Sequence, residues 1–156
     1  MHLPPGLPAQ LTDHYAALIA RPVDWGDMDA ANHVNNTVYI QWAETARIGY
    51  WQLGRLPMQQ DQGPVVARIS AKYIFPVQFP DTIWMGTRFL HMKGDMFFLE
   101  SLMVSEKHQK VACIVETCGV MFDYSLQKKA DPIPEMATIF RETDAQYLGK
   151  TVEKEF

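Results

Sequence analysis

The chain has 156 residues, 47% of them hydrophobic, and a formal net charge of −4. This length fits one domain with a single core, and the apolar content excludes a disordered chain. The sequence has no basic run of the kind that binds nucleic acid and no apolar segment long enough to span a bilayer. Residues 1–15 lack the charged and apolar regions of a signal peptide. We therefore expect one domain over residues 1–156, in the cytoplasm, with no nucleic-acid partner and no membrane insertion.

The first long predicted element is a helix. A strand is plausible near residues 14–24, and residues 37–53 then contain no proline and place apolar or small residues at steps of three and four. Apolar residues extend beyond one face, so the helix should be buried. Asn35 or Asn36 should begin it, because an asparagine side chain can accept hydrogen bonds from the free N–H groups of a first turn.

After the helix the period of the apolar residues changes to two. Alternation over residues 65–75 predicts a half-buried strand, and further strands are expected at roughly 82–92, 96–105 and 111–123. Prolines introduce a short C-terminal helix within 131–143. The sheet must bury one face, and only the long helix is available to cover it. The sequence therefore predicts an α+β fold in which an antiparallel sheet wraps around one long central helix.

The two cysteines, Cys113 and Cys118, are an odd number of positions apart in one predicted strand. Their side chains should point to opposite faces, so we expect two free thiols and no disulfide. The chain has no C-x-x-C spacing, so these cysteines do not indicate a metal site.

The stretch DMDAANHVNN, residues 27–36, sets two carboxylates, a histidine and three asparagines directly before the helix. An EF-hand loop is excluded by Ala31 and Asn32 at its ligand and glycine positions. Two carboxylates and one imidazole are a weak ligand set for another metal, and we expect none. Turn formation and helix capping would explain Asn32, Asn35 and Asn36 without any chemistry.

A catalytic interpretation stands beside this structural one. The start of a helix offers free N–H groups and a partial positive charge, which stabilise an oxyanion on a substrate carbonyl. A nearby carboxylate can attack that carbonyl or activate water. For Asp27 and His33 singly, hydrogen bonding to the backbone explains the residue at least as well as catalysis. The chain has neither a G-x-S-x-G elbow nor a P-loop.

The run DMDAANHVNNTVYIQWAETAR resembles the signature of hotdog-fold thioesterases of the 4-hydroxybenzoyl-CoA thioesterase type. The matching positions are Asp27, Asp29, His33, Val34, Asn35, Asn36, Tyr39, Glu44, Ala46 and Arg47. Weaker matches follow in AKYIFPVQFPD, at Tyr73, Pro76 and Asp81. One position departs from the pattern, because Asn32 replaces the common glycine before the histidine.

The resemblance implies the fold, the reaction and the site. It implies a hotdog fold and a thioester hydrolase that converts an acyl-CoA to free acid and CoA without a cofactor. The catalytic carboxylate would be Asp29, as nucleophile or general base, and the oxyanion donor would be the backbone N–H of Asn36. Four residues would line or support the pocket: Asp27, His33, Asn35 and Tyr39. The resemblance further implies a homodimer or homotetramer with active sites at the subunit interface.

Several alternatives stay open from the sequence. Glu44, in the helix, is a second candidate for the catalytic carboxylate, although Arg47 three residues later could pair with it. The protein could instead bind acyl-CoA or an acyl carrier without turnover, or hydrolyse acyl groups on acyl carrier protein. A double-bond hydratase on the same fold is disfavoured by the match.

Overall fold

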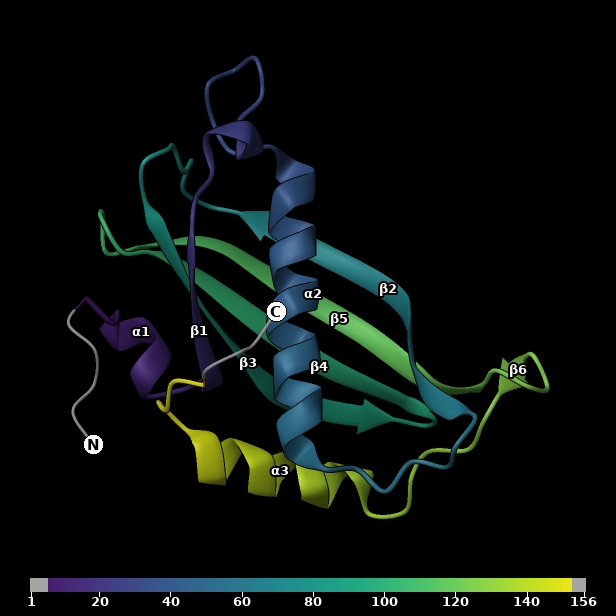
Figure 1. Cartoon of the computed structure of the whole chain (residues 1–156). Helices are drawn as coiled ribbons and strands as arrows, with labels where there is room; N and C mark the ends of the chain where they lie inside the picture. The colour runs from purple at the N-terminus through teal and green to yellow at the C-terminus, as the bar shows by residue number, and fades with distance from the viewer. Residues whose placement is uncertain (1–5, 153–156) are drawn as a thin grey trace.

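The computed structural model describes residues 6–152, and its main feature is an antiparallel sheet in the order β1–β3–β4–β5–β2 (Figure 1). The strands are β1 (Ala16–Pro22), β2 (Gln62–Tyr73), β3 (Thr82–Lys93), β4 (Met96–Ser105), β5 (Lys110–Asp123) and the short β6 (Lys128–Lys129), which pairs with β5. The helices are α1 (Ala9–Thr12), the 3-10 helix η1 (Trp25–Asp27), α2 (Asn36–Gly54) and α3 (Met136–Tyr147). None of the helices in residues 6–152 combines the length and apolarity needed to cross a membrane.

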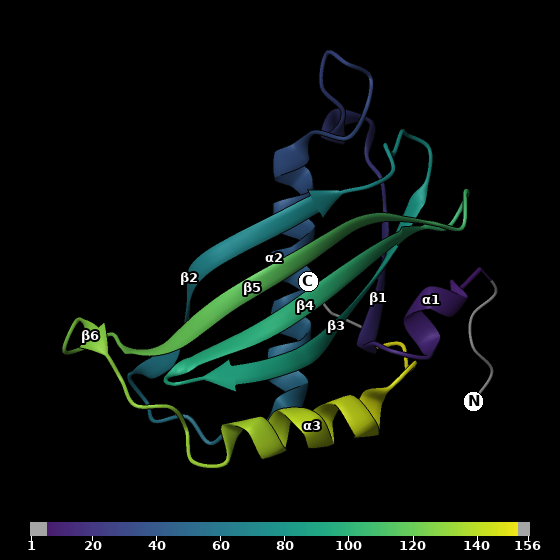
Figure 2. The same cartoon turned by 180° about the vertical axis from the view of Figure 1, so that it is seen from behind.

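The curved sheet wraps around α2, as Figures 1 and 2 show from opposite sides. Asn35 caps the helix: its side chain accepts a hydrogen bond from the Thr37 N–H at 2.9 Å. Trp42 and Tyr50 on α2 are almost completely buried, and burying side chains of this size stabilises a fold by roughly 1.5–3 kcal/mol each. The predicted α+β arrangement, with its central helix, is confirmed.

The C-terminal helix α3 packs across the far end of α2. Phe140 on α3 stacks on Tyr50 and Phe89, with ring centroids 5.9 and 5.1 Å apart. Asp144 accepts hydrogen bonds from the Tyr50 hydroxyl at 2.7 Å and from the Phe89 N–H at 3.1 Å. Phe89 lies beside an irregularity in β3, where the register with β4 shifts between Phe89 and His91. One carboxylate thus ties α3 to both the central helix and the sheet.

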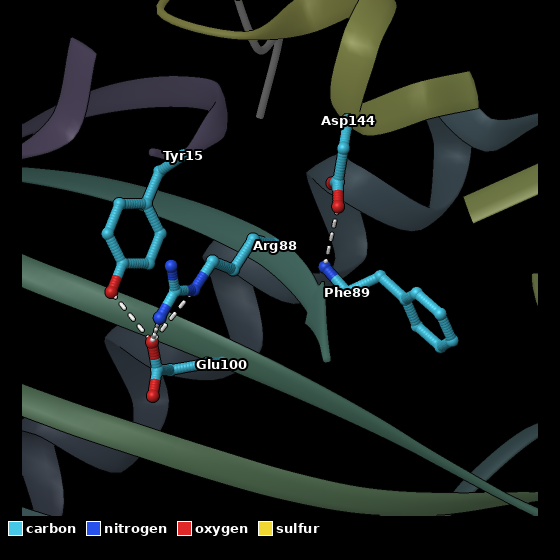
Figure 3. Close-up of polar contacts among 5 residues, drawn as sticks. All are labelled: Tyr15, Arg88, Phe89, Glu100 and Asp144. Carbon is cyan, nitrogen blue, oxygen red and sulfur yellow. Dashed lines mark hydrogen bonds and ion pairs between the residues drawn. The ribbon is translucent and has the colours of Figure 1, made fainter. Parts of the chain in front are cut away.

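The N-terminal segment lies on the sheet face that points away from α2. There Leu11, Tyr15 and Leu18 form an apolar cluster of their own with side chains of β3 and β4. The Tyr15 hydroxyl donates to Glu100 at 2.7 Å, and Arg88 donates to the same carboxylate oxygen from Nε at 3.0 Å and Nη2 at 2.8 Å (Figure 3). These contacts fasten the segment to the outside of the sheet.

The two edges of the sheet differ. Along β1, the Leu18 N–H donates to the Lys150 carbonyl and the Val152 N–H donates to the Leu18 carbonyl, both at 2.9 Å. The outer edge of β2 pairs with no strand among residues 6–152. Residues 150–152 therefore cover the first edge at Leu18, and the second edge is open.

The predicted alternation over residues 65–75, which puts Ala67, Ile69, Ala71, Tyr73 and Phe75 on the buried face of the strand, is only partly correct. Ile69 and Ala71 are half-buried and pack against the core, whereas Ala67 and Tyr73 are exposed. The register between β2 and β5 shifts between Val66 and Arg68. A register shift moves side chains relative to the pleat, and an edge strand has a neighbour on one side only.

Both cysteines are buried free thiols, as predicted. Burial raises the pKa of Cys113 to about 11, which keeps this thiol protonated at neutral pH.

Candidate active site

The loop before α2 folds back on itself. The Asp29 N–H donates to the His33 carbonyl at 3.0 Å, and the Asn32 N–H donates to the Asp29 carbonyl at 2.9 Å. Asn32 has a left-handed backbone with φ of 61°, a conformation that asparagine tolerates better than most residues. The asparagine that replaces the common glycine therefore keeps the turn, and Gln78 secures it by donating to the Asn32 carbonyl at 2.9 Å.

The carboxylate of Asp29 is fixed beside the start of the helix. One oxygen accepts from the Ala31 N–H at 2.8 Å, and the other accepts from Asn35 Nδ2 at 3.1 Å. The residue is exposed, so these two hydrogen bonds orient a carboxylate that remains accessible to solvent.

The first turn of α2 leaves one N–H group available. The Asn35 side chain accepts a hydrogen bond from the Thr37 N–H, and the Asn35 carbonyl accepts one from the Val38 N–H. No acceptor within residues 6–152 takes the N–H of Asn36, the first helical residue. A free N–H at the positive end of a helix dipole is suited to bind an anionic oxygen.

Asp29 and Asn36 both line a cleft of about 340 Å³. Its lining consists of Asp29, His33, Val34, Asn36, Tyr39, Tyr73, Ile74, Phe75 and Pro76. Tyr39 is buried, and its hydroxyl accepts from the Val77 N–H at 3.4 Å. Burial raises the pKa of Tyr39 to about 12, so its phenol stays neutral.

The predicted site residues divide into three groups. Asp29, His33, Asn36 and Tyr39 line the cleft, and Asn35 holds the carboxylate from behind. Asp27 is outside the lining, and its carboxylate accepts from the N–H of Asp24, the residue that caps η1, at 2.9 Å. This position matches the structural interpretation of Asp27.

The opposite wall of the cleft was not predicted as part of the site. Tyr73, at the end of β2, donates from its hydroxyl to the Asn36 carbonyl at 3.1 Å, and the segment from Ile74 to Pro76 continues the wall. The family match at Tyr73 and Pro76 was the only sequence signal for this wall. The apolar pattern of a single segment does not show that residues 73–76 lie beside the start of α2.

A second and larger hollow, of about 630 Å³, lies along the second half of α2. We call it the apolar groove, and its lining consists of Glu44, Arg47, Ile48, Trp51, Gln52, Met58, Gln62, Gly63, Pro64, Val65, Val66, Phe97, Thr117, Gly119 and Tyr124. Glu44, the second candidate carboxylate, therefore lies in this groove and not in the cleft with Asp29.

The ion pair that helical spacing allows between Glu44 and Arg47 does not form within the described part of the chain. Glu44 is exposed, whereas Arg47 is half-buried and donates from Nη1 to Thr117 Oγ1 on β5 at 3.4 Å. Burial lowers the pKa of Arg47, and the charge of Glu44 opposes this shift. Helical spacing allowed the pair, but the nearby strand gives the arginine another partner.

Residues 6–152 contain no group of three or more histidine, cysteine, aspartate or glutamate side chains that could hold a metal ion.

Comparisons with known proteins agree with this architecture. The family model described as the thioesterase-like superfamily matches residues 23–140, while no curated protein sequence gives a significant match. The PA2801 protein of Pseudomonas aeruginosa, described as a candidate thioesterase, is 27% identical with a TM-score of 0.67, over 80% of this chain and 96% of its own.

Two further solved structures are more distant in sequence. A thioesterase from Thermus thermophilus, solved with coenzyme A and Zn, is 22% identical with a TM-score of 0.72, over 85% of this chain and 97% of its own. A 1,4-dihydroxy-2-naphthoyl-CoA thioesterase from Synechocystis is 18% identical with a TM-score of 0.69, over 83% of this chain and 98% of its own. At these identities the likeness concerns the fold, and the predicted hotdog fold is confirmed.

Proposed function

Because the chain belongs to the thioesterase-like superfamily, we propose that it hydrolyses an acyl-CoA thioester to a free acid and coenzyme A. The observation that carries this proposal is the cleft shared by an oriented carboxylate, Asp29, and a helix start with a free N–H, Asn36. The Thermus thermophilus thioesterase solved with coenzyme A supports the CoA part of the proposal.

In the proposed reaction the thioester carbonyl points its oxygen at the Asn36 N–H. Negative charge develops on that oxygen as the carbonyl is attacked, and the N–H together with the helix dipole stabilises it. Asp29 either attacks the carbonyl, giving an anhydride that water then cleaves, or removes a proton from the attacking water. Both routes consume one water and release a carboxylic acid and the CoA thiol.

The remaining cleft residues support this chemistry. Asn35 orients Asp29, and His33 and Tyr39 shape the space around the acyl carbonyl. Tyr39 is neutral and buried, so it offers a polar hydroxyl without a charge. Asp27 contributes indirectly, by stabilising η1 at the entrance of the loop.

A thiol-release assay over a panel of acyl-CoAs tests the proposal, with two matched variants. Asp29→Asn should lower kcat by two orders of magnitude or more, because the amide can neither attack nor accept the proton. Glu44→Gln, the same change at the second candidate carboxylate, should retain most of the turnover. The reverse result would assign catalysis to Glu44.

The same panel separates hydrolysis from binding alone. Wild-type protein that releases no thiol but carries a bound acyl ligand in native mass spectrometry would be a binding protein. Hydrolysis of acyl groups on acyl carrier protein, but not on CoA, would change the carrier and leave the roles of Asp29 and Asn36 intact.

We further propose that the protein acts as a homodimer that pairs along β2. The outer edge of this strand is open, and Val66 and Tyr73 expose 43% and 48% of their surface. An open edge with exposed apolar side chains is a template for another strand. Because Tyr73 also lines the cleft, pairing along β2 would put the active site at the subunit interface.

A further inference from the structure

The guanidinium of Arg47 lies in the apolar groove with little neutralising charge or hydrogen bonding around it. Most of its lining is apolar, and Glu44 and Arg47 are its only charged side chains. Arg47 has one hydrogen bond within the described residues, to Thr117 at 3.4 Å, and no carboxylate within ion-pair distance. A guanidinium offers five donors, so most of its hydrogen-bonding capacity remains free.

The position of this cation costs free energy unless something binds to it. Taking a charge out of water is unfavourable when no partner replaces the water. Glu44 compensates only partly, because it is exposed and more than 4 Å from the guanidinium. The desolvation of Arg47 outweighs the opposing effect of Glu44 on its pKa. An oxygen with negative charge would satisfy the free donors.

Arg47 is aligned with the proposed reaction centre. It follows Asn36 by about three helical turns, which is roughly 16 Å along α2 and about 20° around its axis. The two residues therefore lie on one stripe of the helix. Strand β2 accompanies that stripe, since Tyr73 at its end contacts Asn36 and Val66 near its start lines the groove.

We propose that the apolar groove holds the distal part of the acyl group and that Arg47 binds a carboxylate at its far end. The preferred substrates would then be CoA monothioesters of dicarboxylic acids. This inference rests on the proposed thioesterase function and names its substrate class. The apolar lining contacts the methylene chain, while Arg47 and Thr117 bind the terminal carboxylate.

The span sets the size of the acyl group. The cleft and the apolar groove share no lining residue, so the acyl chain would have to cross the seam between α2 and β2 that separates them. A chain on the order of ten carbons, extended along α2, has the length to span the distance from the Asn36 N–H to the guanidinium. Shorter dicarboxylic chains would leave the guanidinium unpaired, and unbranched monocarboxylic chains would bury it against methyl groups. Both mismatches leave a buried polar group without a partner, which is the strongest basis for discrimination in a binding pocket.

The test compares plain acyl-CoAs with ω-carboxyacyl-CoAs of equal length. For the wild type we expect kcat/KM to favour the carboxylated substrate by at least about tenfold. In Arg47→Met this ratio should fall to near one or below, mainly through a higher KM for the carboxylated substrate. Arg47→Lys, which keeps the charge but not the planar fork, should give an intermediate ratio. Arg141→Met, at an exposed arginine on α3, should keep the wild-type ratio.

Three outcomes would overturn the inference. A wild type that hydrolyses both substrates with equal kcat/KM removes the selectivity but leaves the proposed thioesterase function standing. If Arg47→Met lowers kcat/KM equally for both substrates, Arg47 has only a structural role between α2 and β5. Weaker binding of free CoA by Arg47→Met, measured by calorimetry, would place the CoA phosphates in the groove. If no acyl-CoA of either kind is hydrolysed, the proposed function itself fails.

Discussion

Asn35 connects the helix start to the carboxylate of Asp29. Its Nδ2 donates to Asp29 Oδ2 at 3.1 Å, while its Oδ1 accepts from the Thr37 N–H at 2.9 Å. One amide therefore uses its donor for the carboxylate and its acceptor for the helix. The position of Asp29 relative to the first turn of α2 depends on this side chain.

The two functions of Asn35 can be separated by substitution. Asn35→Ala removes both contacts and should lower the free energy of unfolding by about 1 kcal/mol, the usual cost of a lost N-cap. Asn35→Ser keeps a capping oxygen but has no amide donor for Asp29, so its stability should stay close to that of the wild type. We expect both variants to lose about tenfold in kcat, because Asp29 is left with one orienting hydrogen bond. Urea unfolding and thiol release measure the two effects, and full activity of Asn35→Ser would show that the contact with Asp29 is dispensable.

The oxyanion role of the Asn36 N–H can be tested with proline. Asn36 is the first helical residue, the position where proline is favoured because the missing N–H has no helical partner. The preceding Asn35 has φ of −62° and ψ of 143°, which a following proline accepts. Asn36→Pro should therefore fold normally yet lose about 10²–10³ in kcat, the usual cost of losing one oxyanion donor.

Asn36→Ala is the matched control for this experiment. It removes the side chain but keeps the backbone N–H, so its kcat should stay within a few-fold of the wild type. If proline and alanine at this position reduced kcat equally, the contribution would belong to the side chain, and the backbone donor would have no role.

The carboxylate of Asp144 should make stability depend on pH. Burial raises the pKa of Asp144 above its ordinary value of 3.8, against the opposing hydrogen bonds from Tyr50 and Phe89 and the charge of Arg88. The folded state thus favours the protonated form, and this contribution is present below the ordinary pKa and lost as pH rises through the folded pKa. Asp144→Asn cannot titrate, so the unfolding free energy of the wild type minus that of the variant should decrease between pH 4 and pH 7. Urea unfolding at both pH values measures this difference. A difference that grows with pH would contradict a raised pKa for Asp144.

Pairing along β2 predicts a charge-sensitive dimer. Ala67 is exposed near the middle of β2, so antiparallel pairing of two copies would bring residue 67 of each close to the two-fold axis. Ala67→Glu should split the dimer, because like charges facing each other across strands are destabilising. Ala145→Glu adds the same charge on the exposed side of α3 and should leave the dimer intact. Analytical ultracentrifugation distinguishes the forms, and a monomeric wild type would disprove the dimer.

The sequence was most informative where contacts are local. The apolar spacing over residues 37–53 located α2, and the asparagines before it correctly marked its cap. The period-two segments located β3, β4 and β5 to within about one residue of their observed ends. These features depend on neighbours three or four positions away on a helix, or on alternation along one strand.

The sequence was less informative where distant segments meet. Tyr73 reaches the Asn36 carbonyl across 37 positions, and that contact depends on the register of β2, including its irregularity near Val66. Helical spacing allowed a pair between Glu44 and Arg47 that does not form, because spacing along a helix does not show which strand lies beside the arginine. The catalytic roles of Asp29 and Asn36 stay predictions until the variants are measured.

The unequal edges of the sheet limit how copies of this protein can add to one another. Residues 150–152 already occupy the backbone groups of β1 at Leu18, whereas the outer edge of β2 pairs with no strand among residues 6–152, so the β2 side is the edge more open to a strand from a neighbouring molecule. Two copies joined through β2 use the same surface on both partners, and such a contact closes after one addition. In the proposed dimer the edge of β2 is already used, so a further edge-to-edge addition would have to take place at β1, where residues 150–152 occupy the backbone groups of Leu18.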